Sequence, residues 1–429
     1  MPEMGESPRL AADDLREARL RTEALVADLP DHLLRVPQVE NVNPLLWEIG
    51  HVAWFQEYWL LRRLHGEDPL RAQGDALYDS AAVAHATRWD LPLPDRRGTA
   101  AYMEATLERT IAMLERRPAA PATRYFSELA TFHEDMHDEA LLYTRQFLGY
   151  PAPAFAGAAG VSAGGSASPE GDVEIPGGLL MLGARPDDGF VFDNEKWAHP
   201  VLLRPFRMAR TPVTNARYRD FVAGGGYARR ELWSEEGWAF RSARALEHPV
   251  YWRRLGQGAW ERRRFDSWIA LRDDEPVVHV SWHEAQAYCR WARRRLPSEA
   301  EWEFAAAMTG DGERLRYPWG NDPPTAERAN LDHARGDVVA VGACGAGDTP
   351  WGCRQMLGNV WEWTADAFGP YPGFVTDPYA EYSQPWFGTH KVLRGGAWTT
   401  RARLVRNTWR NFYLPHRTDV AAGFRTCAL

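Results

Sequence analysis

The sequence predicts an α+β protein with two domains, a four-helix bundle followed by a mixed domain of short strands and helices. First, a chain of 429 residues is long enough to bury two separate cores. Second, apolar residues recur near helical spacing in residues 1–150, whereas residues 173–429 contain short strand-like runs between turns rich in Gly, Pro, Asn and Asp. Third, residues 151–172 are rich in Ala, Gly, Ser and Pro, which predicts a flexible linker.

Four helices are expected in the first domain. They cover Leu10–Leu29, Asn43 to about Gly66 with Pro44 in the first turn, Thr99–Arg117 ended by Pro118, and Pro121–Leu148 ended by Gly149. One extended connection, Glu67–Gly98, joins the second helix to the third. Helices of this number and length form a bundle, and bundles place metal ligands on their inward faces.

The second domain is expected to contain only a few short helices. The clearest covers Trp282–Arg295 and ends before Leu296-Pro297. Short strands and irregular segments make up the rest, and the sequence contains no evident internal repeat.

Composition excludes several classes of protein. The formal net charge of -8 argues against a nucleic-acid partner, and the absence of an 18-residue apolar run argues against a membrane span. The four cysteines are too few and too scattered for a disulfide scaffold. The first residues, Met1–Arg9, lack the order of a signal peptide. We therefore expect a cytoplasmic protein.

The segment His133-Glu134-Asp135-Met136-His137 says most about the chemistry. Histidines four residues apart lie on one face of a helix, so they can hold one metal ion when a third ligand comes from elsewhere. His51 is the candidate, because it lies among apolar residues on the side that a bundle buries, and His65 at the end of the same helix is the spare. Three histidines leave positions open for substrate and dioxygen, which suits Fe(II).

A zinc peptidase is the competing interpretation. His133-Glu134-x-x-His137 matches the short zinc-peptidase motif, in which Glu134 would be the general base. The continuation with a glycine and a third histidine is absent from Asp138–Tyr150. A glutamate ligand further along would fall in or beyond the predicted linker, a poor place for a rigid ligand.

Both halves of the chain resemble known domains. Asn43-Pro44-Leu45-Leu46-Trp47-Glu48-Ile49-Gly50-His51 and the paired-histidine segment resemble the DinB-like bundle of ergothioneine-type sulfoxide synthases. The second half resembles the formylglycine-generating-enzyme fold, a C-type-lectin-like architecture. Its motifs are Pro276-Val277-Val278-His279-Val280-Ser281-Trp282, Arg295-Leu296-Pro297-Ser298-Glu299-Ala300-Glu301-Trp302-Glu303, Gly358-Asn359-Val360-Trp361-Glu362-Trp363, Leu393-Arg394-Gly395-Gly396-Ala397-Trp398 and Gly423-Phe424-Arg425. The cysteine pair of formylglycine-generating enzymes is absent, since Thr399–Val405 occupies its place.

The resemblance implies an Fe(II) enzyme that uses dioxygen to join a sulfur or selenium donor to C2 of the imidazole of hercynine, the trimethylated betaine of histidine. It implies that His51, His133 and His137 bind the iron. It implies Tyr379 as the proton donor of the reaction and Tyr382 as the second candidate. Tyr78 is a rival, because some relatives place the working tyrosine on the connection between the second and third helices.

The resemblance also implies residues that bind the two substrates. Asn411-Phe412 matches an Asn-Trp pair that lines the hercynine pocket, and Met136 replaces a glutamine there. Members that use γ-glutamylcysteine have two arginines where this chain has His85 and Arg88. Tyr413 replaces an aspartate that holds the donor's amino group, while Arg417 is retained.

These departures favour a neutral sugar over an amino-acid donor, because hydroxyl groups need hydrogen bonds and stacking on rings such as Trp89 or Tyr413. The chain most resembles the selenoneine-forming branch of the family, which couples hercynine to the selenosugar 1-seleno-β-D-glucose. A synthase of the ergothioneine pathway, using γ-glutamylcysteine or cysteine, is the alternative. A non-catalytic module that binds a betaine is a further alternative, and the intact triad of histidines counts against it.

Overall fold

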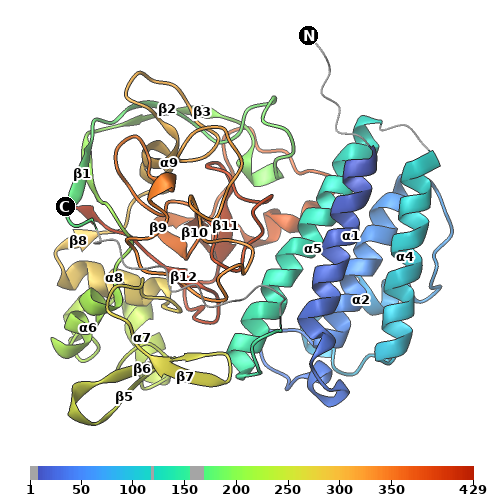
Figure 1. The fold of residues 1–429 in the computed structure, drawn as a ribbon, viewed down its shortest axis with the longest axis horizontal. Helices are drawn as coiled ribbons and strands as arrows, with labels where there is room; N and C mark the ends of the chain where they lie inside the picture. Colours follow the sequence, from blue (N-terminus) through green and yellow to red (C-terminus); the bar gives the residue numbers. More distant parts are fainter. Residues whose placement is uncertain (1–7, 117–119, 155–168) are drawn as a thin grey trace. The chain divides into compact units, whose positions relative to one another are not determined.

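The computed structural model describes residues 8–116, 120–154 and 169–429, and the chain divides into two compact units, Met1–Ala156 and Gly157–Leu429. The first unit is helical, and the second combines short strands with short helices (Figure 1). The predicted α+β class is therefore confirmed. Residues 155–168 of the predicted linker lie outside the described residues, so its flexibility stays a prediction.

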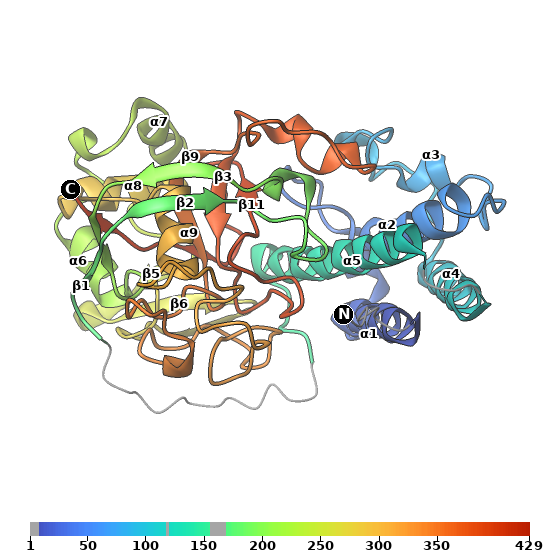
Figure 2. The same ribbon diagram turned by 90° about the horizontal axis from the view of Figure 1, so that it is seen from above.

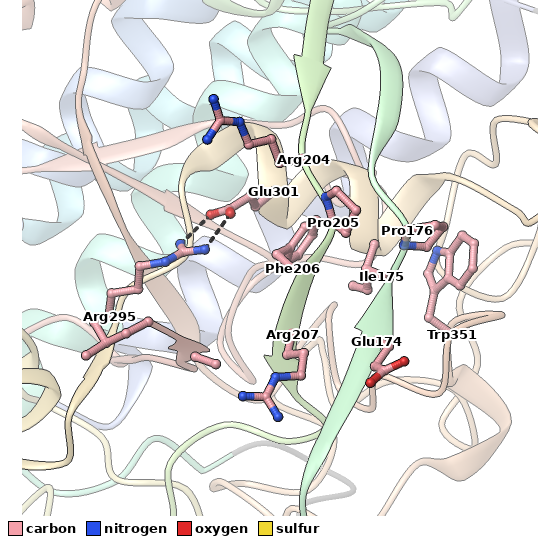
Figure 3. A pocket seen from close by; sticks show the side chains of 12 residues that line it. Glu174, Ile175, Pro176, Arg204, Pro205, Phe206, Arg207, Arg295, Glu301 and Trp351 are labelled. Carbon is pink, nitrogen blue, oxygen red and sulfur yellow. Dashed lines mark hydrogen bonds and ion pairs between the residues drawn. The ribbon is translucent and has the colours of Figure 1, made fainter.

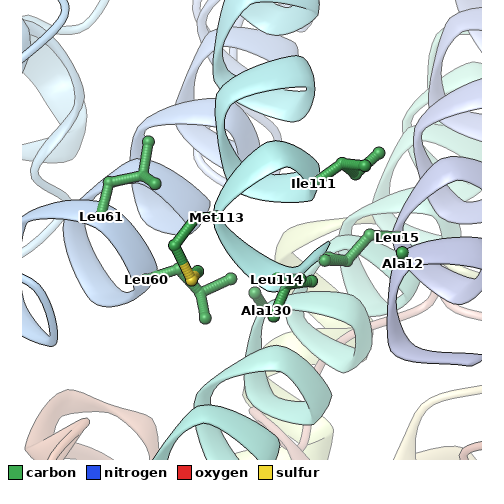
Figure 4. Packing of buried hydrophobic residues seen from close by; sticks show 8 residues of the cluster. All are labelled: Ala12, Leu15, Leu60, Leu61, Ile111, Met113, Leu114 and Ala130. Carbon is green, nitrogen blue, oxygen red and sulfur yellow. The ribbon is translucent and has the colours of Figure 1, made fainter. Parts of the chain in front are cut away.

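Four long helices form the bundle of the first unit. They are α1 (Pro8–Ala27), α2 (Leu45–Gln56), α4 (Arg96–Arg116) and α5 (Pro121–Leu148). Helix α1 packs against α5 and α4, and α2 packs against the same two helices. The core at one level of the bundle consists of Ala12, Leu15, Leu60, Leu61, Ile111, Met113, Leu114 and Ala130 (Figure 4). Burying each large apolar side chain of this kind contributes roughly 1.5–3 kcal/mol.

Two of the helix boundaries follow from local signals. Helix α5 has Pro121 in its first turn and ends where Gly149 adopts a left-handed conformation with φ of 66°, as predicted. Helix α4 begins at Arg96, earlier than the predicted Thr99. The reason is Asp95, whose carboxylate accepts a hydrogen bond from the Gly98 backbone N–H at 2.8 Å and so caps the helix.

The second predicted helix is divided. Helix α2 continues into η2, a π-helical segment at Glu57–Arg63, in which backbone hydrogen bonds span five residues instead of four. The connection that follows is not wholly extended, because it contains α3 (Gly74–Tyr78) and the 3₁₀ turn η3 (His85–Thr87). A further 3₁₀ turn, η1, covers Asp31–Arg35.

Four small sheets organise the part of the second unit that the structure describes. One has the order β1 (Asp172–Ile175), β4 (Phe206–Ala209), β13 (Cys427–Ala428), β8 (Arg294–Arg295); another has the order β11 (Asn411–Tyr413), β10 (Lys391–Arg394), β9 (Trp361–Ala367), β12 (Ala422–Gly423). The remaining two are the hairpin of β2 (Gly178–Leu182) with β3 (His199–Leu203), and the meander β5 (Trp252–Arg254), β6 (Trp260–Arg264), β7 (Ser267–Ala270). Pairing is antiparallel except between β12 and β9.

Short helices and turns connect these strands. The helices are α6 (Asn215–Ala223), α7 (Glu235–Ala243), α8 (Trp282–Trp291) and α9 (Glu299–Ala307), and α9 packs against β2 and β3 (Figure 2). The 3₁₀ turns are η4 (Asp193–Glu195), η5 (Arg230–Leu232), η6 (Gly256–Gly258), η7 (Gly345–Gly347), η8 (Ala380–Tyr382) and η9 (Gln384–Trp386).

The predicted end of α8 is wrong. The helix stops at Trp291, Arg293 adopts a left-handed φ of 54°, and Arg294–Arg295 then pairs as β8 with β13. This pairing joins segments far apart in the sequence, so a local pattern could not reveal it.

Buried ion pairs hold the second unit together. The side chains of Glu299 and Glu303 on α9 pair with Arg394 on β10, and Glu299 also pairs with Arg410. All four lie in the core, where an unpaired charge would be costly. The glutamates of the recognised motif therefore maintain the fold.

Within the described residues, no helix is both long and apolar enough to cross a bilayer.

Candidate metal centre and substrate residues

Three histidines of the bundle converge. His51 on α2 meets His133 and His137 on α5, and one ring nitrogen from each lies within 4.8 Å of the others. The centroids of the rings are 4.5–5.0 Å apart. Among the residues that the structure describes, this is the one cluster of at least three histidine, cysteine or carboxylate ligands with metal-binding spacing.

Hydrogen bonds orient two of these rings. Nδ1 of His51 donates to the backbone carbonyl of Tyr78 at 2.7 Å, and Nδ1 of His137 donates to Oε1 of Glu48 at 2.8 Å. A carbonyl or carboxylate oxygen can only accept, so both rings carry their proton on Nδ1. Nε2 of each ring is left with a lone pair for a metal, as in the outer-shell hydrogen bonds of known metal sites.

The environment keeps the buried imidazoles neutral. His133 stacks face to face on Phe55 with centroids 3.6 Å apart, and His51 stacks on Trp47 at 4.7 Å. Burial lowers the pKa of both His51 and His133 well below the usual value, and the nearby imidazole of His137 lowers both further. Neutral imidazole is the form that binds metal ions.

The donor set fits a divalent transition metal. Three neutral nitrogen ligands on two helices supply half of an octahedral shell and leave positions for exchangeable ligands. His65, the spare candidate, lies beyond η2 and is not part of the cluster.

Glu134 is not available as a peptidase base. Its carboxylate accepts hydrogen bonds from Nε of Arg19 at 2.7 Å and from Oγ1 of Thr22 at 2.9 Å, both on α1. The neighbouring Asp138 also bonds Thr22. These carboxylates tie α5 to α1, while the histidines project toward α2, so the geometry counts against the zinc-peptidase interpretation.

Tyr78 contributes its backbone carbonyl, which holds His51. The Tyr78 side chain is fully buried against Gly50 of α2 and stacks near-parallel on Tyr102. Burial raises the pKa of its phenol. A methyl group on Gly50 would lie 2.4 Å from the Tyr78 ring, so this close approach requires glycine.

The three predicted donor residues of the connection contact the segment between α1 and α2. His85 donates from Nε2 to the carbonyl of Val42 at 2.9 Å, and Trp89 donates to the carbonyl of Val36 at 3.1 Å. Arg88 is only 9% exposed and donates to Oδ1 of Asn43 at 2.6 Å. Arg88 and Trp89 also line a small cavity of about 190 Å³.

The predicted tyrosines of the second unit lie in an aromatic group. Tyr382 stacks on Phe192 with centroids 4.3 Å apart and contacts Phe412 edge-on, and Tyr379 lies beside Tyr382. Phe412 in turn stacks on Phe368 at 4.0 Å. The structure therefore brings together the predicted tyrosines and the predicted hercynine pair, although they are about thirty residues apart in the chain.

The remaining predicted residues have these surroundings. Asn411 accepts from the Phe412 backbone N–H, and Met136 is half-buried on α5 beside the paired histidines. The guanidinium of Arg417 lies 5.0 Å from the ring of Tyr413 and pairs with Asp419 at 2.5 Å.

A larger cavity of the second unit involves none of these residues. It measures about 1020 Å³ and is lined by Glu174, Ile175, Pro176, Arg204, Pro205, Phe206, Arg207, Arg295, Glu301, Trp351, Ala428 and Leu429 (Figure 3). Arg295 there forms an ion pair with Glu301 at 2.6 Å.

Sequence reasoning missed Glu48 and Asn43, although both lie in the recognised motif. Glu48 precedes His51 by three residues, so both side chains lie on one face of α2. That spacing was the available signal for Glu48. Asn43 is linked to the site through Glu48 and accepts a hydrogen bond from Arg88, a contact that no spacing rule reveals.

A helical bundle with three converging histidines, followed by a mixed α+β domain, defines a two-domain enzyme with a candidate metal site. The DinB superfamily matches residues 14–141, and the sulfatase-modifying factor enzyme 1-like domain matches residues 159–428. Hercynine oxygenase of Mycobacterium tuberculosis is 38% identical over 427 residues, 98% of each chain. Hercynine oxygenase of Mycolicibacterium thermoresistibile is 38% identical over 96% of this chain and 93% of its own length.

The chain therefore belongs to the hercynine oxygenase family, a family of oxidoreductases. Formylglycine-generating enzyme of Streptomyces coelicolor is similar over 65% of this chain and 95% of its own length, at 35% identity. The four cysteines here are all buried and unpaired with one another. The family and fold predicted from the motifs are confirmed.

Proposed function

We propose that this protein is an Fe(II)- and dioxygen-dependent enzyme that joins a selenosugar to C2 of the imidazole of hercynine. The observation that carries the proposal is the buried triad of His51, His133 and His137, two of whose rings are oriented through Nδ1. A chain of the hercynine oxygenase family with this triad has the ligands for iron. Ferrous iron held there would supply the activation of dioxygen.

The overall conversion replaces the C2–H bond of the imidazole and the Se–H bond of the donor by a C2–Se bond. When the product is the selenoxide, one oxygen atom of O₂ remains on selenium and the other leaves as water with both hydrogens. Dioxygen is then the sole oxidant. A tyrosine would move a proton in this reaction, and we assign that role to Tyr379.

The second unit offers the surface for hercynine. The faces of Phe412 and its aromatic neighbours suit a trimethylammonium group, which aromatic rings attract without an ion pair. Asn411, on the same strand, would hydrogen-bond the imidazole or the carboxylate of the betaine.

The assignment of a neutral sugar as the donor rests on charged residues that are either replaced in this chain or neutralised by a neighbour. His85 replaces an arginine and donates to a backbone carbonyl, and Tyr413 replaces an aspartate. Arg417 is retained, but Asp419 neutralises it. Charge-assisted contacts to an amino-acid donor, each worth about 1.5–3 kcal/mol, would therefore be lost. A neutral sugar does not need them.

The near-full-length similarity to hercynine oxygenases supports the second candidate, a synthase of the ergothioneine pathway that uses γ-glutamylcysteine or cysteine. A direct competition separates the two. Iron-loaded protein, hercynine and oxygen are incubated with 1-seleno-β-D-glucose, 1-thio-β-D-glucose, cysteine or γ-glutamylcysteine, and products are identified by mass. We expect the selenosugar to be consumed fastest. Consumption of γ-glutamylcysteine alone would overturn the donor assignment.

A metal test separates the enzyme from a module that only binds a betaine. We expect the purified protein to bind one Fe(II) per chain and His133→Ala to lose both iron and turnover. A binding module would bind hercynine equally well with and without iron.

A further inference from the structure

The resemblance assigns Arg88 to the donor, but the structure gives this side chain other partners. Its guanidinium is among the buried charged groups, at 9% exposure. Nη1 donates to Oδ1 of Asn43 at 2.6 Å and Nη2 donates to the carbonyl of Val83 at 3.3 Å. The plane of the guanidinium lies over the ring of Trp47, with Cζ 3.9 Å from the centroid.

Two of these contacts, those with Asn43 and Trp47, continue to a histidine of the triad. On one side, Nδ2 of Asn43 approaches Oε2 of Glu48 at 3.4 Å, and Oε1 of Glu48 accepts from His137. The first of these hydrogen bonds is long, whereas the second is short and partly buried. The path therefore runs from Arg88 through Asn43 and Glu48 to one metal ligand.

On the other side, the ring of Trp47 lies between Arg88 and His51. Trp47 stacks on His51 with an interplanar angle of 10°, and its Nε1 donates to the carbonyl of Leu77 at 2.7 Å. The next carbonyl in the chain, that of Tyr78, accepts from Nδ1 of His51. The connection that carries Arg88 thus fixes His51 from the ring face and from Nδ1.

We propose that Arg88 is a positioning residue that sets the orientation of two metal ligands, His137 through Asn43 and Glu48, and His51 through Trp47. This inference rests on the proposed iron site but assigns Arg88 a role that does not depend on the donor. Donation to two separate acceptors combined with stacking suits arginine, because lysine lacks both the planar fork and the stacking face.

The test measures metal binding without either substrate. Full-length apo-protein is titrated anaerobically with Fe(II) against a chromogenic chelator, and Co(II) absorption spectra report the ligand geometry. We expect Arg88→Lys and Arg88→Met to raise the metal dissociation constant about 10-fold or more, the range typical of outer-shell substitutions, and to shift the Co(II) bands. Arg97→Lys and Arg97→Met, at an exposed arginine on α4, are the matched controls and should change neither.

A second variant tests the path without altering Arg88. Asn43→Asp keeps an acceptor for Arg88 but places a carboxylate beside Glu48, which repels it from its present position. We expect weaker metal binding here too. The double variant Arg88→Met/Asn43→Ala tests whether the two residues act together. Its loss of metal affinity through the Glu48 path should not exceed the sum of the losses in the two single variants, because both substitutions act on His137.

The outcomes separate the inference from the function it rests on. Suppose that the Arg88 and Asn43 variants keep the metal affinity and the Co(II) spectra of the wild type and only raise the KM for the donor. That result would overturn the positioning role and leave the iron site intact. Failure of the wild-type protein to bind Fe(II) would overturn both. Circular dichroism of each variant identifies any loss of fold, and Asn43→Asp then decides the question.

Discussion

At the scale of single residues, the geometry of the candidate metal centre depends on atoms outside the three histidines. Glu48 is almost completely buried and uses one carboxylate oxygen to hold Nδ1 of His137. The Tyr78 carbonyl does the same for His51. A histidine whose second nitrogen is fixed keeps its tautomer and ring orientation, which favours metal binding.

Glu48→Gln and Glu48→Ala test this role directly. The glutamine can still accept from Nδ1 but carries no charge, so we expect the metal dissociation constant to rise about 10-fold, and further with alanine. Melting temperatures of the apo-proteins show whether the fold is retained. Equal metal affinity in the wild type and in Glu48→Ala would show that the hydrogen bond has no influence on the site.

The role of each candidate tyrosine can be tested separately. Ion pairing of Lys196 with Asp377 at 2.7 Å and hydrogen bonding of Ser383 to Asp193 at 2.5 Å anchor the segment that carries Tyr379. We expect Tyr379→Phe to lower kcat at least 100-fold, the typical contribution of a positioned proton donor, with little change in KM for hercynine.

Tyr382→Phe and Tyr78→Phe are the comparison variants for steady-state kinetics. Tyr382 stacks on Phe192, and Tyr78 packs against α2, so phenylalanine preserves the main contact of each ring. A larger loss of kcat in either variant than in Tyr379→Phe would transfer the proton-donor role to that residue.

At the scale of elements, the predictable features are those with local causes. The ends of α5 follow from Pro121 and Gly149, and the spacing of His133 and His137 placed them on one helix face. The triad could also be predicted because the apolar neighbours of His51 indicate a buried position on α2. These signals are properties of a few adjacent residues.

The features that escaped prediction have causes distant in sequence. Helix α8 ends early because Arg294–Arg295 pairs with β13, and Arg88 is buried because Asn43 and Trp47 receive its guanidinium. Hydrophobic periodicity carries no information about either contact. The same reason explains why the pair of histidines could be predicted, whereas the contacts of Arg88 with Asn43 and Trp47 could not.

The close contact of Gly50 on α2 with Tyr78 on α3 leads to a further prediction. In Gly50→Ala the new methyl group would overlap the Tyr78 ring, at 2.4 Å from its nearest atom. Alanine favours the helix by about 1 kcal/mol, but overpacking costs typically 1–3 kcal/mol, so we expect net destabilisation. Displacement of Tyr78 would also move the carbonyl that orients His51.

Urea unfolding and metal titration of the same variant measure both effects. Gly50→Ala/Tyr78→Leu makes room for the methyl group and should recover part of the stability. No loss of stability in Gly50→Ala would show that the tyrosine moves aside at little cost.

At the scale of the whole chain, both units bury arginine–glutamate ion pairs. In the first unit Glu134 on α5 pairs with Arg19 on α1, and in the second unit such pairs lie in the core. The second unit also buries histidines. There they make stability depend on pH.

Two of these histidines determine the direction of that dependence. Burial lowers the pKa of His279 and His283 from 6.5 to about 4. Between pH 4 and pH 6.5 the unfolded chain therefore binds more protons than the folded chain. The stability that the neutral histidines contribute is fully present above about pH 6.5 and is lost as the pH falls through 4. Each histidine accounts for up to about 3 kcal/mol.

His279→Asn should reduce this acid sensitivity. Asparagine tolerates the left-handed φ of 64° at this position and does not titrate, so the difference in unfolding free energy between pH 7 and pH 4.5 should shrink by about 2 kcal/mol. Hydrogen exchange of the backbone around Val280 measures the stability of this unit, since two domains need not unfold together. His32→Asn, at an exposed histidine of the first unit, is the control. An unchanged pH dependence in His279→Asn would show that other groups cause the acid sensitivity.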